Sequence, residues 1–214
     1  AFVLFGAVHG HVSANAVYSR GSWLTPFGKI RIDEQLADRL VDRCGGILER
    51  NESAHDNEHS LEVQMPFIKY FFPQASAVPI SVLPTEDAPA LGKCVGEFLK
   101  ECDADTFVVG TTDLTHYGDS YMFAPAGEGT EAREWMKRND ARIVELAADM
   151  RAKEIVPEAN RSMNACGAGA MAATVAAAKA LGCGAGLTVE YTTSYDVMPE
   201  RKFRMAVGYV GMIF

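Results

Sequence analysis

Short apolar runs alternate along the chain with longer segments in which apolar residues recur every three or four positions. Runs rich in branched and aromatic side chains predict strands at residues 2–5, 77–83, 106–109, 187–193 and 205–214. Helical spacing of the apolar positions predicts helices at residues 33–44, 85–102, 130–150 and 165–181. This alternation is typical of an α/β fold with an open sheet.

The stretch at residues 106–118 joins one predicted strand to a polar tip. Phe107–Val109 are expected to form a buried strand, and Asp113 and His116 follow it closely. In an open α/β sheet, ligands bind outside the carboxyl ends of the strands, so both side chains are predicted to project into a functional crevice. Alternatively, Asp113 caps a turn and His116 is a surface residue.

A second predicted strand also ends in histidines. Phe2–Phe5 is followed by Gly6 and then by His9 and His11. The two imidazoles lie on one side if the strand continues, and apart if a loop begins at Gly10. Either could instead simply bond a loop carbonyl.

A third concentration of ionisable groups lies at residues 55–62. Glu58, His59 and Glu62 could share one face of a helix, which Pro66 would end or kink. His59 is therefore a secondary site candidate. The alternative is an acidic helix start that the helix dipole favours.

The five cysteines are odd in number and include no Cys-x-x-Cys pair, so neither a disulfide framework nor a zinc ribbon is predicted. That pattern favours the reducing cytoplasm, with Cys94 and Cys102 as inert packing or surface residues. Cys166 differs because it begins the alanine-rich helix. A helix N-terminus stabilises the thiolate, which binds metals or attacks electrophiles, although such a cysteine can also be purely structural.

Length and composition exclude several classes of protein. A chain of 214 residues with 48% hydrophobic residues can bury the core of one domain. A net charge of −8 argues against binding to nucleic acid. The sequence contains no apolar run of about 18 residues that would span a membrane. It has no Walker loop and no strand-coupled Gly-x-Gly-x-x-Gly, so no nucleotide cofactor is expected.

Four motifs occur in one order over nearly the whole chain: Gly6-Ala7-Val8-His9, Asn57-Glu58-His59-Ser60-Leu61-Glu62, Thr112-Asp113-Leu114-Thr115-His116-Tyr117-Gly118 and Asn164-Ala165-Cys166-Gly167. In this the chain resembles the Memo family, including the bacterial AmmeMemoRadiSam system protein B. That family is similar in fold to the class III extradiol dioxygenases, non-haem iron enzymes that open catechol rings. The resemblance implies a single domain over residues 1–214, with an open mixed sheet flanked by helices on both faces. Because the chain begins in mid-strand without methionine, a further N-terminal segment is expected upstream.

The resemblance also implies a metal site. His9 and Cys166 match two of the family's metal ligands, and a third, a histidine of an upstream His-Ala-Gly motif, has no counterpart here. Asp113 and His116 match the segment beside the metal, and His59 matches the Glu-His-Ser motif. Gly-Ala-Val-His and Thr-Thr-Asp replace the family's Gly-Pro-Ser-His and Ser-Ser-Asp.

Two histidines with one anion leave coordination positions open for dioxygen and substrate, and a thiolate favours iron, copper or zinc. We therefore expect iron(II) or copper, with zinc as another choice, in redox or dioxygenase-type chemistry on a small-molecule or peptide ligand. His116 would act as acid/base and Asp113 would orient it. The family name implies a radical SAM partner. Two other functions stay open: a non-catalytic peptide- or partner-binding module that uses the old pocket, and a hydrolase in which Cys166 is the nucleophile beside His116 and Asp113.

Overall fold

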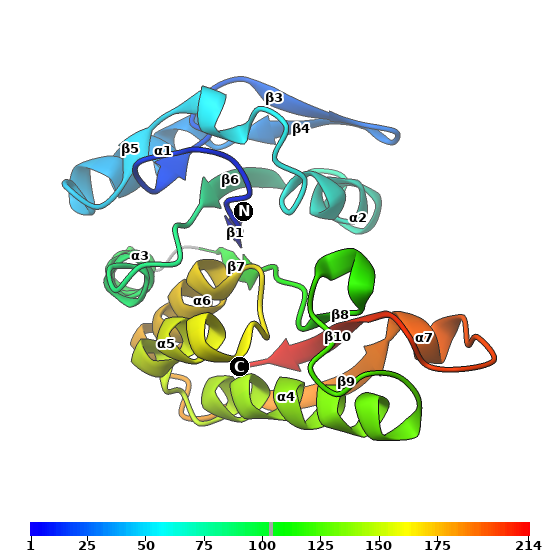
Figure 1. Ribbon diagram of the computed structural model, residues 1–214. Helices are drawn as coiled ribbons and strands as arrows, with labels where there is room; N and C mark the ends of the chain where they lie inside the picture. Colours follow the sequence, from blue (N-terminus) through cyan, green and yellow to red (C-terminus); the bar gives the residue numbers. More distant parts are fainter. Residues whose placement is uncertain (103–104) are drawn as a thin grey trace.

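The structure is a computed structural model that describes residues 1–102 and 105–214 (Figure 1). Its larger sheet is seven-stranded and mixed, with the central order β3-β4-β6-β1-β7 and with β2 and β5 extending from β6. Its strands are β1 (Phe2–Gly6), β2 (Ala16–Val17), β3 (Ser22–Thr25), β4 (Gly28–Ile32), β5 (Glu49–Arg50), β6 (Ser76–Ser81) and β7 (Phe107–Gly110). β1 lies parallel to both β6 and β7. The predicted α/β class with a mixed sheet is confirmed.

A second, antiparallel sheet consists of β8 (His116–Tyr117), β10 (Ala206–Ile213) and β9 (Leu187–Thr193), in that order. It lies against α4 (Thr130–Ala148) in the lower part of Figure 1.

An apolar groove of about 540 Å³ lies between β7 and β10, lined also by α6 (Ala168–Leu181). β7 is therefore only partly covered. The prediction of a buried strand is wrong there, since Phe107 is 59% exposed.

Helices cover both faces of the larger sheet, as predicted. On β1, Val3 and Phe5 face the main core beneath the helices, whereas Phe2 and Leu4 face a smaller core on the other side. The main core includes residues of α1 (Glu34–Arg43), α3 (Ala88–Glu101), α5 (Ala152–Ser162) and α6. The smaller core is covered by α2 (Met65–Phe71). The short helices are η1 (Glu52–His55), η2 (Glu62–Gln64), η3 (Asp119–Tyr121) and α7 (Ser194–Val197).

Small residues allow α3 and α6 to pack backbone to backbone. A Cβ atom added to Gly92 would lie 1.9 Å from the carbonyl oxygen of Ala173, and one added to Gly96 would lie 2.5 Å from that of Ala177. The alanine-rich composition of α6 is thus explained by close packing rather than by a membrane. Within residues 1–102 and 105–214, no helix combines the length and the apolar character that crossing a bilayer requires.

The segment that contains the third concentration of ionisable groups is not the helix that the sequence suggested. Glu58 and His59 lie in the turn between η1 and η2, so they share no helical face with Glu62. Pro66 lies in the first turn of α2 rather than ending a helix. Proline is favoured there because the first helical amides have no partner within the helix.

Cys44 and Cys94 form a disulfide, which corrects the prediction that no cysteines pair and that Cys94 is inert. The bridge joins the C-terminal cap of α1 to the middle of α3. Cys102, Cys166 and Cys183 are free. Because disulfides are rare in reducing compartments, the cysteines no longer favour the cytoplasm, and that location stays a prediction.

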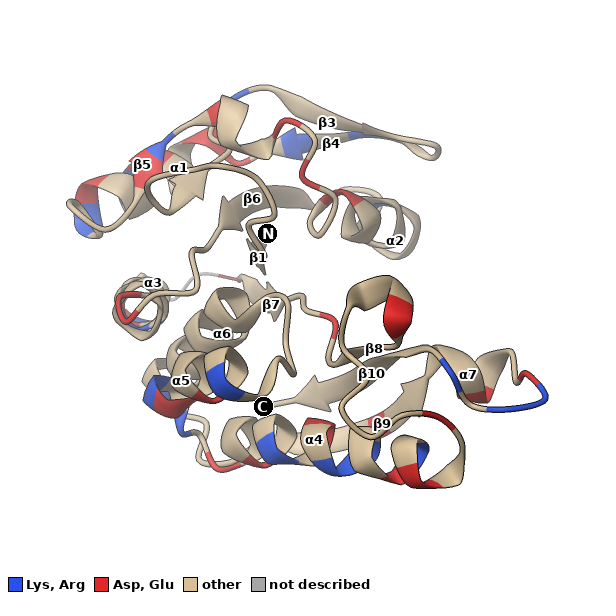
Figure 2. Cartoon of the chain, viewed as in Figure 1, with Lys and Arg blue, Asp and Glu red and all other residues tan. Residues whose placement is uncertain are grey.

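Charged residues of both signs are mixed on the surface helices. Figure 2 shows Lys and Arg interspersed with Asp and Glu along α4, as the sequence pattern suggested. Lys137 and Glu134 form an ion pair on α4, three positions apart. Mixed charge of this kind is typical of a solvated outer helix.

Candidate functional site

The parallel pairing of β1 with β7 brings two of the polar segments to one edge of the sheet. Gly6 ends β1 and Gly110 ends β7, so the residues that follow each strand leave the sheet at the same edge. Gly6 is also required by packing, because a Cβ atom there would lie 2.4 Å from Leu61. The absence of that atom lets the 58–61 segment close against the end of β1.

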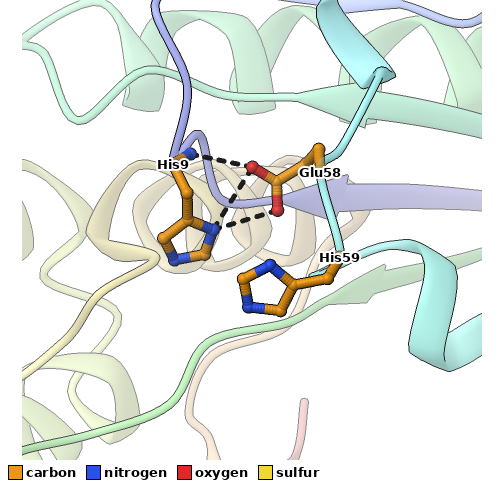
Figure 3. Close-up of side chains that lie close together, drawn as sticks. All are labelled: His9, Glu58 and His59. Atoms are coloured by element: carbon orange, nitrogen blue, oxygen red, sulfur yellow. Dashed lines mark hydrogen bonds and ion pairs between the residues drawn. The ribbon is translucent and has the colours of Figure 1, made fainter.

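His9 is held by Glu58 (Figure 3). The backbone N–H of His9 donates to Oε2 of Glu58 at 2.8 Å, and the imidazole Nδ1 lies 3.0 Å from Oε1 and 3.2 Å from Oε2. The backbone N–H of Ser60 also donates to Oε1 of Glu58, at 2.9 Å. One buried carboxylate therefore orients both the backbone and the ring of His9.

These contacts keep Glu58 ionised. Burial would raise the pKa of its carboxyl group, but the hydrogen bonds from Ser60 and His9 outweigh burial and lower the pKa to about 2. An ionised carboxylate can only accept a hydrogen bond, so Nδ1 of His9 is the donor in this contact. In the neutral form of such a ring, the other nitrogen, Nε2, has a free lone pair.

His59 completes the first group of possible metal ligands. Its ring stacks on that of His9, with centroids 4.6 Å apart and an interplanar angle of 21° (Figure 3). His9, Glu58 and His59 each offer a ligand atom, and these atoms lie within 4.8 Å of one another. Two imidazoles and a carboxylate are a donor set that divalent transition metals accept.

A second group contains Asp113, His116 and Cys166, again with ligand atoms within 4.8 Å of one another. Nε2 of His116 lies 3.4 Å from Oδ2 of Asp113, and Tyr121 stacks on the His116 ring with centroids 5.0 Å apart. The backbone N–H of Cys166 donates to the carbonyl of Asp113 at 3.2 Å. The loop after β7 and the residues before α6 are therefore joined directly.

Thr112 positions Cys166 within this group. Its hydroxyl lies 4.0 Å from the sulfur, donates to the carbonyl of Asp113 and accepts the N–H of Gly167, the N-cap of α6. Burial nevertheless raises the pKa of the Cys166 thiol, and the charge of Asp113 adds to the effect. The sequence suggested a thiolate stabilised by the helix. In the metal-free protein the thiol is instead kept protonated at neutral pH.

A buried network of hydrogen bonds around Asp140 supports the second group. Oδ1 of Asp140 accepts the backbone N–H of Thr115 at 2.9 Å, and Oδ2 accepts the hydroxyl of Tyr191 at 2.7 Å. Burial raises the pKa of Asp140 despite these bonds. Tyr191 on β9 therefore holds Asp140 on α4, and Asp140 holds the backbone of Thr115. Because Thr115 directly precedes His116, these bonds help to position the backbone of His116.

The five residues singled out from the sequence thus fall into two groups at one edge of the sheet. His9 and His59 belong to one group, and Asp113, His116 and Cys166 to the other. A hydrogen bond of 3.3 Å from Gln64 to the Thr111 hydroxyl links their segments. His11 is exposed and belongs to neither group.

Glu58 and His55 have roles in this region that the sequence pattern does not indicate. The sequence pattern places Glu58 on a helical face with His59 and Glu62 and does not indicate that it binds His9. His55 is buried, and burial lowers its pKa, so the ring is neutral at neutral pH. No sequence pattern indicated that burial.

Comparisons with known proteins show the family to which the chain is related. The family described as Memo-like protein matches residues 1–213. A MEMO1 family protein of Pyrococcus abyssi is 35% identical over 99% of this chain and 75% of its own length, and one of Thermococcus onnurineus is 33% identical over 100% and 75%. The crystal structure of an uncharacterized Escherichia coli K12 protein is similar in fold alone, with a TM-score of 0.56 and 13% identity over 97% of this chain and 85% of that one. The chain belongs to the Memo-like protein family.

Proposed function

We propose that this chain binds a non-haem metal ion, iron(II) or copper, with His9 and Cys166 among the ligands, and uses it in redox or dioxygenase-type chemistry on a small-molecule or peptide ligand. The observation that supports this most is the presence of two groups of metal-ligating side chains at one edge of the sheet in a Memo-like chain. Their segments are linked through Gln64 and Thr111.

Each group offers donor types that such an ion accepts, and His9 and Cys166 come from different groups. An ionised carboxylate that accepts the Nδ1 proton of a histidine, as Glu58 does for His9, is the usual partner of a metal-binding imidazole. His59 offers a second imidazole beside it. The thiol of Cys166 would lose its proton on binding, so metal affinity should rise with pH.

An iron or copper ion supplies redox chemistry that the side chains of this chain lack. The surrounding residues supply positioning and proton transfer. Asp113 holds Nε2 of His116, and Tyr121 limits rotation of the ring, so Nδ1 of His116 is the nitrogen available to exchange a proton with a ligand. We assign His116 the role of acid/base and Asp113 that of its orienting partner.

Metal content of the full-length protein, purified anaerobically without chelator, tests the proposal. We expect near-stoichiometric iron or copper in the natural protein and a large loss in His9→Ala and in Cys166→Ala. Cys183→Ala is the matched control, because that cysteine is also free but lies outside both groups. Unchanged metal content in both site variants would overturn the assignment.

Exposed apolar and aromatic side chains beside His116 support the alternative function as a binding module. Met122 is 94% exposed, and Tyr121 and Tyr209 are partly exposed. Apolar side chains around a polar site can hold a peptide without any chemistry. A protein free of metal that also takes up no added iron, copper or zinc would move this function to first place.

For the hydrolase function, the residues are present but the protonation state of the cysteine is unfavourable. Asp113, His116 and Cys166 do come together, but a thiol whose pKa is raised by burial is a poor nucleophile. A reactive cysteine of this type needs an environment that lowers the thiol pKa. We therefore rank the hydrolase last.

A further inference from the structure

A cavity of about 430 Å³ opens beside the first group of ligands. It is hereafter called the amine pocket, and its walls include Tyr18, Trp23, His55, Asp56, Glu58 and Glu62. Because Glu58 and His59 line the pocket and also belong to the first group, a molecule in the pocket would lie beside these two members of that group. Its volume is within the range of small-molecule sites.

Three aromatic rings line the amine pocket, those of Tyr18, Trp23 and His55. The rings of Tyr18 and Trp23 have centroids 5.3 Å apart and are tilted by 46°. His55 meets both rings edge-on, at 5.6 Å from Tyr18 and 6.2 Å from Trp23. Tyr18 and Trp23 thus form a cluster of aromatic rings in the wall of the pocket, and the faces of such rings attract cations.

Carboxylates also line the pocket. Asp56 and Glu62 are exposed, and Glu58 is ionised and engaged with His9. Among the residues that the structure describes, no lysine or arginine lines the pocket to neutralise these acids. A cationic ligand would therefore find negative charge that no side chain of the wall balances.

His55 closes the inner wall. It is only 6% exposed, and its Nε2 has no hydrogen-bond partner in the part of the chain that the structure describes. Its Nδ1 lies 3.3 Å from the hydroxyl of Ser81. The ring is thus fixed in place by β6 and adds a third aromatic surface to the pocket.

We propose that the amine pocket binds the organic ammonium group of a small-molecule ligand, with the cation against Tyr18 and Trp23 and near the carboxylates of Asp56 and Glu62. This rests on the proposed function in one respect: it identifies the substrate class of the metal site as small molecules that contain an amine. The ammonium group holds the ligand in the pocket, and the rest of the molecule extends toward His9.

Binding of tetramethylammonium to the full-length protein tests the pocket, with tert-butanol as an uncharged probe of similar shape. Both are titrated by ligand-detected NMR into chelator-treated protein and into metal-loaded protein. We expect the cation to bind about tenfold more tightly than the alcohol, which corresponds to the usual strength of a cation over aromatic rings. Equal binding of the two probes, or binding of neither, would overturn the proposal.

Variants locate the binding. Trp23→Leu should abolish the preference for the cation, and Glu62→Gln should weaken it several-fold, more so at low salt. Trp23→Phe keeps an aromatic ring and should retain part of the preference, so a folding defect in the leucine variant cannot be mistaken for the effect. Glu86→Gln is the matched control, since Glu86 is an exposed acid outside the pocket.

The two proposals fail separately. Cation binding in protein that takes up no metal would support the pocket and overturn the metal site. Metal bound at His9 and Cys166 without any preference for the cation would keep the metal site and remove the amine as its substrate class.

Discussion

Among single residues, Glu58 combines deep burial with a carboxyl pKa of about 2. The free carboxyl group has a pKa of 4.5, so protonation begins in the unfolded state first. Ionised Glu58 therefore stabilises the folded protein relative to the unfolded chain. This contribution is fully present above pH 4.5 and is lost as the pH falls toward 2. At about 1.4 kcal/mol per pKa unit, the stabilisation from the ionised Glu58 should amount to about 3 kcal/mol.

Glu58→Gln should therefore lower the free energy of unfolding at neutral pH and flatten its dependence on pH in the acid range. Urea unfolding of metal-free protein at a series of pH values measures this. Glu86→Gln, an exposed acid, should change neither quantity by more than a few tenths of a kcal/mol. Parallel curves for the natural protein and Glu58→Gln would show that the hydrogen bonds to Glu58 do not stabilise the fold.

Cys166 leads to a prediction about reactivity. Because its thiol pKa is raised above the ordinary value of 9.0, little thiolate exists at neutral pH in metal-free protein. Alkylation by iodoacetamide should be slow at neutral pH. Its rate should rise about tenfold per pH unit until the pH reaches the raised pKa of the Cys166 thiol. Mass spectrometry in a Cys102→Ser, Cys183→Ser background follows the reaction. Fast labelling at neutral pH would contradict the raised thiol pKa and would support the hydrolase function.

The parts of the site that the sequence predicted are those that follow directly from strands. Asp113 and His116 could be placed because a parallel strand precedes them, and His9 for the same reason. The role of Glu58 could not be predicted, because η1, η2 and the turn between them have no apolar periodicity from which to infer direction. The burial of Cys166, which decides its protonation, depends on residues distant in sequence.

At the level of elements, the α3–α6 contact depends on glycines. Alanine is normally favoured over glycine in a helix by about 1 kcal/mol. At Gly92, however, the added Cβ would meet the backbone of Ala173 at 1.9 Å, and a carbonyl cannot rotate away as a side chain can. The steric cost should therefore exceed the gain in helix propensity.

Gly92→Ala should lower the stability of the protein by about 1–3 kcal/mol, as overpacked cores usually do. Thermal and urea unfolding check the size and sign. Gly45→Ala is the matched control, because the nearest atoms to a Cβ there are 3.7 Å away or more. A variant at Gly92 as stable as the natural protein would mean that α6 can shift at little cost.

Elements with a clear periodic pattern and a cap were predictable. α1 begins after Asp33, whose carboxylate accepts the N–H of Leu36, and β9 has the predicted limits, Leu187–Thr193. α5 was missed because Pro157 lies inside it, which normally argues against a helix. The division of the strands into two sheets was not predictable, since strand pairing depends on contacts between distant segments.

For the molecule as a whole, the Cys44–Cys94 disulfide is the main covalent constraint. It closes a loop with a sequence separation of 50 residues, and restricting a loop of that size in the unfolded chain stabilises the folded state by about 4 kcal/mol. The sequence could not predict this pair, because the two cysteines meet only when α1 packs against α3.

Reduction should therefore lower the melting temperature markedly, and Cys44→Ser with Cys94→Ser should reproduce the effect without reductant. Calorimetry with and without dithiothreitol measures both. Cys102→Ser is the control, since that cysteine is free and its replacement should leave the response to reductant unchanged. A melting temperature that is insensitive to reductant would show that the bridge contributes no stability.

The same bridge makes residues 44–94 a closed covalent ring, and Glu58 and His59 lie within it. A protease that cuts once in the exposed turn near Asn57 would open the ring without releasing a fragment. The nicked protein would remain one species until it is reduced and would then separate into two. Damage to the loop that orients His9 would thus leave both halves of the molecule tied together, in position to keep or regain their fold.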